Sequence, residues 1–152
     1  MARTYNEQWQ DIADGYLAEI GHDRATASEI ASWAIDQGLW RPSPQLVLNK
    51  AAADVARALR EDYITDPQGR SVRAKHAVRV VEEGVQHTFW ADLRHAPPLH
   101  VEMALKQRRH QIVADCLQLK TDMDSYNQNY NAGRQLTMDF DFTLDLRELD
   151  AA

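Results

Sequence analysis

A run of apolar residues with a 3.5-residue repeat is the feature that most constrains what this chain can fold into. Pro97 and Pro98 suit the start of a helix, and the repeat continues to about residue 130. Its members lie at spacings of seven, four, three, four, three and four: Leu105, Ile112, Cys116, Leu119, Met123, Tyr126 and Tyr130. The spacing predicts a long helix over residues 98–130, which extends roughly 50 Å at 1.5 Å per residue.

A helix of this length is long for a domain of 152 residues. We therefore expect it to project and to pair two copies of the chain into a homodimer. The predicted dimerisation residues are Leu105, Ile112, Cys116, Leu119, Met123 and Tyr126. The alternative is a helix that lies across its own domain, with Cys116 as an inert core thiol.

Three shorter helices are predicted ahead of it. Apolar residues spaced by three and four indicate a helix over residues 5–20. Thr26 and Glu29 form the signature of a capping box for a second helix, which Gly38 ends. Ser43 followed by Pro44 predicts the start of a third helix.

The apolar period changes to two after Glu61. Residues 66–69, Asp-Pro-Gln-Gly, predict a type I turn. In the strand that follows, one face carries Val72, Ala74, His76, Val78 and Val80, and the other carries Arg73, Lys75 and Arg79. Gly84 predicts a hairpin turn before a return strand over about residues 85–92. His76 is then expected to be a hydrogen-bonded core histidine.

The chain alternates again after the long helix. From Leu136 to Leu146, every second residue is apolar, and the residues between include Asp139, Asp141 and Asp145. This pattern predicts a terminal β-strand, or an acidic segment that folds on a partner. The predicted fold class is α+β: a winged-helix-like domain of three helices and a β-hairpin over residues 1–95, then the long helix and a terminal β-strand over residues 96–152.

Charge is distributed unevenly along the chain. The net charge of −6 divides into −5 over residues 1–40, +4 over residues 41–79 and −5 over residues 80–152. A basic middle third favours a polyanionic partner. The predicted contacts to double-stranded DNA lie on the third helix and the hairpin: Lys50, Arg57, Arg60, Arg70, Arg73, Lys75 and Arg79. The alternative is an exposed sheet face whose cations only discourage edge pairing.

Residues 5–80 also resemble the HARE-HTH type of winged helix. The similarity is carried by Glu29-Ile30, by Trp33-Ala34-Ile35, and by Gly38-Leu39-Trp40 with Pro44 shortly after. The resemblance implies duplex DNA binding, as a regulator or an accessory factor in a DNA-associated complex. Two departures weigh against simple docking in the major groove: the connection between the second and third helices is long, and so is the hairpin.

The segment after the long helix resembles a second known motif. Gln135, Leu136, Met138 and Phe140 are similar to the Gln-Leu-x-Leu-x-Leu peptide that docks on the bacterial sliding clamp. Alternate apolar side chains of an extended peptide would fill a groove on a protein. The alternative function is therefore a protein-interaction adaptor that uses its acidic C-terminal residues 134–152.

Catalytic signatures are not found in the sequence, and we expect neither an enzyme nor a cofactor. The six histidines do not have a metal-ligand spacing, and no phosphate-binding glycine loop occurs. The sequence contains no signal-peptide pattern and no apolar run long enough to cross a membrane. With a single cysteine, these features predict a cytoplasmic protein.

Overall fold

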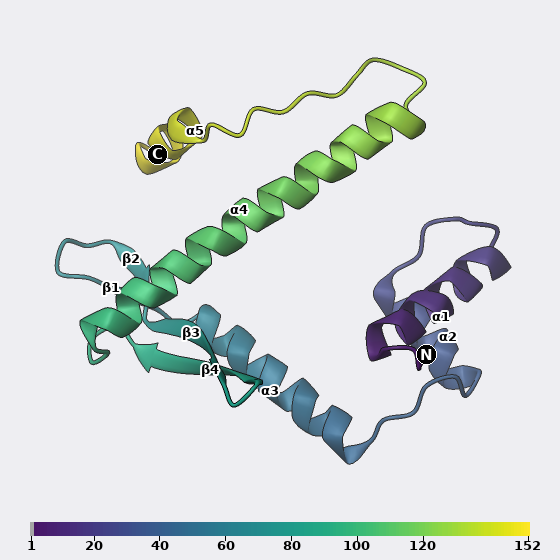
Figure 1. The fold of residues 1–152 in the computed structure, drawn as a ribbon, viewed down its shortest axis with the longest axis horizontal. Helices are drawn as coiled ribbons and strands as arrows, with labels where there is room; N and C mark the ends of the chain where they lie inside the picture. The colour runs from purple at the N-terminus through teal and green to yellow at the C-terminus, as the bar shows by residue number, and fades with distance from the viewer. Residues whose placement is uncertain (1) are drawn as a thin grey trace. The chain divides into compact units, whose positions relative to one another are not determined.

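The computed structural model describes residues 2–152, which divide into two units (Figure 1). The first unit ends at Ala56 and the second begins at Arg57, so that the division falls within a helix. The predicted boundary after residue 95 differs from this division and stays a prediction. The described residues form five helices and two antiparallel hairpins, which confirms the α+β class.

The first unit contains α1 (Tyr5–Glu19), α2 (Ala27–Asp36) and most of α3 (Pro44–Arg60). The predicted capping box of α2 is confirmed, because Thr26 accepts from the Glu29 backbone while the Glu29 side chain accepts from the Thr26 backbone. Aromatic rings join α1 to the connection between α2 and α3: Trp9 contacts Trp40 with their centroids 5.7 Å apart. The winged-helix arrangement of these helices stays a prediction.

The second unit begins with two hairpins. Strands β1 (Tyr63–Thr65) and β2 (Ser71–Arg73) form the first, and β3 (Lys75–Glu82) and β4 (Val85–Asp92) form the second. The β3–β4 connection has only two residues, Glu83 at φ 50° and Gly84 at φ 76°. Positive φ at both central positions is the mark of a type I′ turn, whose twist matches that of the strands. The hairpin predicted around Gly84 is therefore confirmed.

Helix α4 (Pro98–Asn129) packs on β3 and supplies the core of the second unit (Figure 1). Val78 and Ala104 are each 3% exposed at this contact, and His76 is 8% exposed. The His76 ring bonds through Nε2 to the Arg73 carbonyl at 3.0 Å. This confirms the predicted core histidine. The predicted helix over residues 98–130 is confirmed to within one residue.

The continuous strand predicted over residues 72–80 is wrong. Ala74 lies between β2 and β3, is fully buried, and belongs to neither strand. Its N–H donates to the Asp62 carbonyl at 2.8 Å, and its carbonyl accepts from the Leu93 N–H at 2.7 Å. These two bonds turn the chain from one hairpin into the other, so Arg73 and Lys75 do not share one strand.

The predicted terminal β-strand is also wrong. Residues 134–142 adopt no regular structure, and residues 143–150 form α5 (Thr143–Asp150). A strand is stable only when a neighbouring strand satisfies its backbone, and no strand within residues 2–152 pairs with this segment. Asp141 instead accepts from the Thr143 N–H at 3.1 Å beside the start of α5. We call residues 134–142 the tail.

No helix within residues 2–152 combines the length and the apolar character needed to span a membrane.

Candidate functional site

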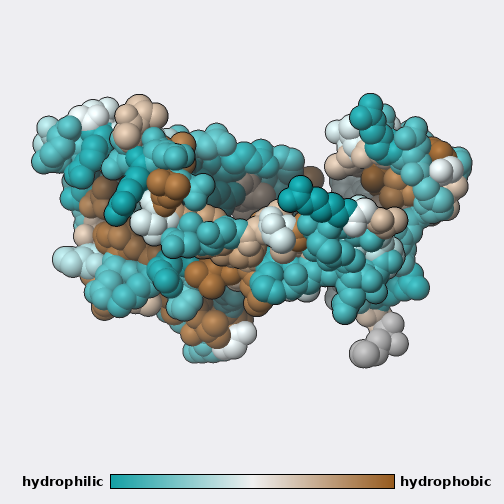
Figure 2. All heavy atoms as spheres, turned by 90° about the horizontal axis from the view of Figure 1, so that it is seen from above, coloured by the Kyte–Doolittle hydropathy of each residue, from teal (hydrophilic) through white to brown (hydrophobic). Residues whose placement is uncertain are grey.

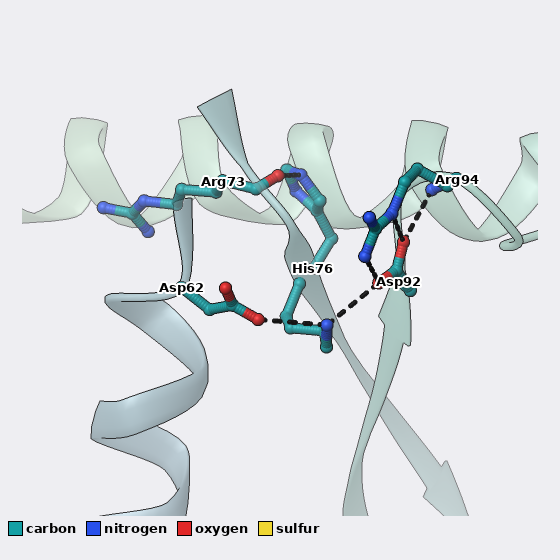
Figure 3. Close-up of polar contacts among 6 residues, drawn as sticks. Asp62, Arg73, His76, Asp92 and Arg94 are labelled. Carbon is teal, nitrogen blue, oxygen red and sulfur yellow. Dashed lines mark hydrogen bonds and ion pairs between the residues drawn. The ribbon is translucent and has the colours of Figure 1, made fainter. Parts of the chain in front are cut away.

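The row of exposed cations predicted at Arg73, Lys75 and Arg79 is interrupted by an ion-pair cluster at Lys75. The Lys75 Nζ lies 3.0 Å from Asp62 Oδ2 and 2.9 Å from Asp92 Oδ2, between the ends of α3 and β4 (Figure 3). The Lys75 side chain is only 24% exposed. The hydrogen bonds that Lys75 donates to Asp92 and to Asp62 raise its pKa. Lys75 is therefore a compensated, half-buried cation and not the outward-facing one that the alternation predicted.

Asp92 forms an ion pair with a second cation in the same cluster, Arg94. The Arg94 guanidinium donates to both Asp92 oxygens, at 3.0 Å through Nε and 2.8 Å through Nη2 (Figure 3). Arg94 and Lys75 together hold the pKa of the Asp92 carboxyl far below its usual range. This arrangement ties the start of β3 to the end of β4. Its position between two strand ends indicates a structural role.

Two further predicted DNA contacts are paired with carboxylates of the same element or turn. Lys50 lies 2.6 Å from Asp54, one turn along α3, and Arg70 lies 2.7 Å from Asp66 across the turn after β1. Arg57 also has an interaction partner. For the remaining three, Arg60, Arg73 and Arg79, we find no ion pair within residues 2–152. The seven predicted cations therefore do not form one uncompensated surface.

Gln107 on α4 binds the backbone of Arg79 with both halves of its amide. Its Oε1 accepts from the Arg79 N–H at 2.8 Å, and its Nε2 donates to the Arg79 carbonyl at 2.9 Å. An amide reproduces in this way the two bonds that a neighbouring strand would make. The free edge of β3 is closed at its middle as a result. Nothing in the sequence pattern distinguishes Gln107 from other polar residues of α4.

The predicted dimerisation residues lie along α4 with much of their surface uncovered. Leu105, Ile112, Leu119 and Tyr126 are between 46% and 53% exposed, and Cys116 and Met123 are half-buried. Tyr130, just beyond the end of α4, is more exposed still. We call these residues the α4 seam, defined as Leu105, Ile112, Cys116, Leu119, Met123, Tyr126 and Tyr130. The core contact of α4 with β3 uses other residues, among them Ala104 and Gln107.

The tail leaves α4 at a defined point. Asn127 binds both backbone groups of Leu136: its Nδ2 donates to the carbonyl at 2.9 Å, and its Oδ1 accepts from the N–H at 3.0 Å. Gln135 Nε2 adds a 3.4 Å bond to the Asn127 carbonyl. After Leu136 the chain turns back from the end of α4 and leads into α5 (Figure 1). Leu136 and Met138 are each 49% exposed, and Phe140 is half-buried against Phe142.

Apolar residues are also visible at the surface in the space-filling view, as brown areas among teal ones (Figure 2). No group of three or more His, Cys, Asp or Glu side chains within residues 2–152 is arranged to hold a metal ion. Candidate surfaces for function within residues 2–152 include the α4 seam, the tail, and the three predicted DNA contacts without an ion pair, Arg60, Arg73 and Arg79.

Comparison with known proteins adds no further guide: no family model matches the chain, and no curated protein or solved structure is significantly similar to it.

Proposed function

We propose that this chain is a protein-interaction adaptor that binds its partners along the α4 seam and through residues 134–152. The observation that carries the proposal is the row of large apolar side chains that α4 leaves exposed: Leu105, Ile112, Leu119 and Tyr126 are each between 46% and 53% exposed. Apolar side chains of this size gain free energy when a partner removes them from water.

The buried apolar side chains within residues 2–152 are few and small: Ala34, Ala74, Val78 and Ala104. A further protein surface is the natural source of the missing burial.

The chemistry of the exposed residues favours a protein over a polyanion. Large apolar side chains in a row along a helix are typical of a helix-in-groove or coiled-coil interface. The acidic residues between the apolar residues of the tail give it a second, charged face. The ion pairs of Lys50, Arg70 and Lys75 reduce the positive charge that a polyanion would meet.

The proposal is tested by placing charge on the α4 seam. Ile112→Glu with Leu119→Glu should abolish capture of native partners by the tagged full-length chain, because two carboxylates would be buried at the interface. The matched control is Ala114→Glu with Thr121→Glu, which adds the same charge at the same spacing on another exposed face of α4. Equal capture by both double variants would exclude the seam as the binding surface.

Binding of double-stranded DNA is a second candidate, favoured by the unpaired Arg60, Arg73 and Arg79 and by the resemblance to a winged helix. Binding should then be steeply salt-dependent. Arg60→Glu with Arg79→Glu should weaken it and reduce the salt slope by about two. Arg134→Glu with Arg147→Glu makes the same charge change in the C-terminal residues. This control should leave both the DNA affinity and the salt slope unaltered. Affinity insensitive to salt would eliminate this candidate.

A further inference from the structure

We propose that the partner at the α4 seam includes a second copy of this chain, and that the tail of each copy adds as a strand to β4 of the other. This inference rests on the proposed function and deepens it, because it names one partner and one contact. Three observations support it: an open strand edge, an unpaired extended segment, and a distance that separates the two within one chain.

The outer edge of β4 is open, whereas that of β3 is not. In an antiparallel pair, opposite residues either both bond across the ladder or both point away from it. Arg79 bonds to Gln107 and so points away, and its register partner is Thr88. With a period of two, the N–H groups of Gln86, Thr88 and Trp90 therefore face outward. We find no partner for these three groups within the described part of the chain.

Open edges in natural proteins are usually protected by charge, proline or a covering element. β4 has no charged residue before Asp92 and no proline. Its Phe89 pairs with the buried Val78 and so lies on the face toward α4, yet Phe89 is 48% exposed and Val85 is 56% exposed. The edge therefore offers unpaired backbone groups together with an uncovered apolar face.

The tail has the complementary pattern. It is extended and unpaired, and Leu136, Met138 and Phe140 alternate with Thr137, Asp139 and Asp141. With its apolar face beside Phe89, the tail would present its aspartates on the other face of the sheet. On that face Thr88 adjoins Arg79, whose guanidinium has no carboxylate partner among residues 2–152. Strand addition would thus place the apolar side chains of the tail beside Phe89 and its aspartates on the same face as Arg79.

A chain cannot place its tail along the middle of its own β4. Gln107, which contacts Arg79, and Asn127, which holds Leu136, are 20 residues apart on α4, about 30 Å. The six tail residues after Leu136 extend at most about 20 Å. They end well short of Thr88. A tail at this edge must therefore come from another copy.

Antiparallel pairing of two α4 seams would bring the partner's tail to the correct place. In the register that uses every seam position, Cys116 meets the partner's Leu119 and Ile112 meets the partner's Met123. The partner's Asn127 then lies level with Arg108, next to the hairpin. Arg109 occupies the position of the repeat between Leu105 and Ile112, which the seam leaves out because it is charged. In this register it meets the partner's Tyr126, a favourable cation–π partner.

A parallel pair is disfavoured at the same position. It would place Arg109 opposite the partner's Arg109 inside the seam, where like charges are costly. The antiparallel register does bring Asp115 near the partner's Asp122. This contact is at the solvent-exposed rim, where water and salt screen the repulsion.

Amide hydrogen exchange, followed by NMR on the full-length chain, tests the strand addition. At a total chain concentration 100 times the dimer Kd, about one chain in fifteen is still monomeric, so the N–H groups of Gln86, Thr88 and Trp90 should exchange about 15-fold more slowly than in the dilute monomer. Met138→Pro with Asp139→Pro should remove this protection, since the tail can then no longer pair. Leu144→Asn with Leu149→Asn changes two exposed apolar residues of α5 instead, and should retain it.

Three results would overturn the inference: no protection in the concentrated wild type, protection that persists on dilution, or protection that persists in the proline variant. The second would indicate the chain's own tail, and the third would indicate pairing of two β4 strands. If partner capture still depends on the α4 seam in these cases, the proposed function survives while this inference fails.

The orientation has a separate test in a Cys116→Ser background. A mixture of Ile112→Cys and Met123→Cys chains should form a disulfide between the two variants on mild oxidation, and neither variant alone should do so. A disulfide formed by Ile112→Cys alone would indicate parallel helices and overturn the inference.

Discussion

Asp92 is the residue on which the polar contacts of the second unit converge. It receives Lys75 and Arg94, and its backbone carbonyl accepts from the N–H groups of His95 and Ala96 at 3.0 and 2.8 Å. The sequence places Asp92 at the end of a predicted strand but does not indicate its partners. Lys75 is 17 residues away, and its pairing depends on the β3–β4 register.

The ionisation of Asp92 makes the stability of the second unit depend on pH. Its pKa is lowered from 3.8 in the folded chain, so its contribution is present above pH 3.8 and is lost as the pH falls further. The pKa of Lys75 is raised from 10.5, so its contribution is present below pH 10.5 and is lost as the pH rises beyond it. Asp92→Asn removes the Asp92 contribution and weakens that of Lys75, which keeps its bond to Asp62.

We therefore expect Asp92→Asn to lower the stability at pH 7 and to flatten its decline between pH 4 and pH 2, measured by urea unfolding with far-UV detection. Asp150→Asn, at the end of α5, is the matched control and should follow the wild type. If the stability of Asp92→Asn declined between pH 4 and pH 2 as steeply as that of the wild type, the cluster would contribute nothing to stability.

Helix ends are the elements that local sequence determines best. The capping boxes of α1 and α2 each use a threonine and a glutamate three residues apart, and the second was predicted from that spacing alone. Pro98 likewise begins α4 as expected. These features form within one turn of helix, so no distant residue can alter them.

Thr26→Ala should destabilise the first unit by about 1 kcal/mol, because the Glu29 N–H loses its side-chain acceptor at the start of α2. Tryptophan fluorescence during urea unfolding is a suitable measurement, since Trp9, Trp33 and Trp40 belong to this unit. Ser28→Ala, at an exposed position of the same helix, is the control and should change the stability much less. Equal effects of the two substitutions would argue that the capping box does not stabilise α2.

Strands were predicted less well than helices, for a physical reason. Alternation identifies which residues share a face, but it does not show where one strand ends and the next begins. Ala74 fits the alternation of residues 72–80, yet its backbone bonds to Asp62 and Leu93 separate β2 from β3. The tail alternates equally well, and without a neighbouring strand it remains unpaired and continues into α5.

At the scale of the whole molecule, the main finding is that the chain buries little of its apolar surface. Long side chains of the α4 seam, the tail and α5 remain exposed, and the fully buried residues are small. Such a chain gains stability from association, because a partner that binds only the folded state shifts the folding equilibrium.

The melting temperature of the second unit should therefore rise with protein concentration if two copies associate. Each tenfold increase adds at most about 1.4 kcal/mol to the apparent stability of a dimer above its Kd. Scanning calorimetry over a hundredfold range of concentration is the measurement. Ile112→Glu with Leu119→Glu should have a melting temperature that is independent of concentration, whereas Ala114→Glu with Thr121→Glu should behave as the wild type. A concentration-independent wild type would contradict self-association.

The sequence by itself determined the features that depend on neighbours along the chain: the α+β class, the capping box at Thr26, the turn at Gly84 and the extent of α4. Only the tertiary structure decided the break at Ala74, the compensation of Lys75, the bond from Gln107 to Arg79 and the unpaired state of the tail. Each of these depends on whether a residue far along the chain reaches a particular backbone or side chain. Periodicity describes one element at a time, so it contains no information on such contacts.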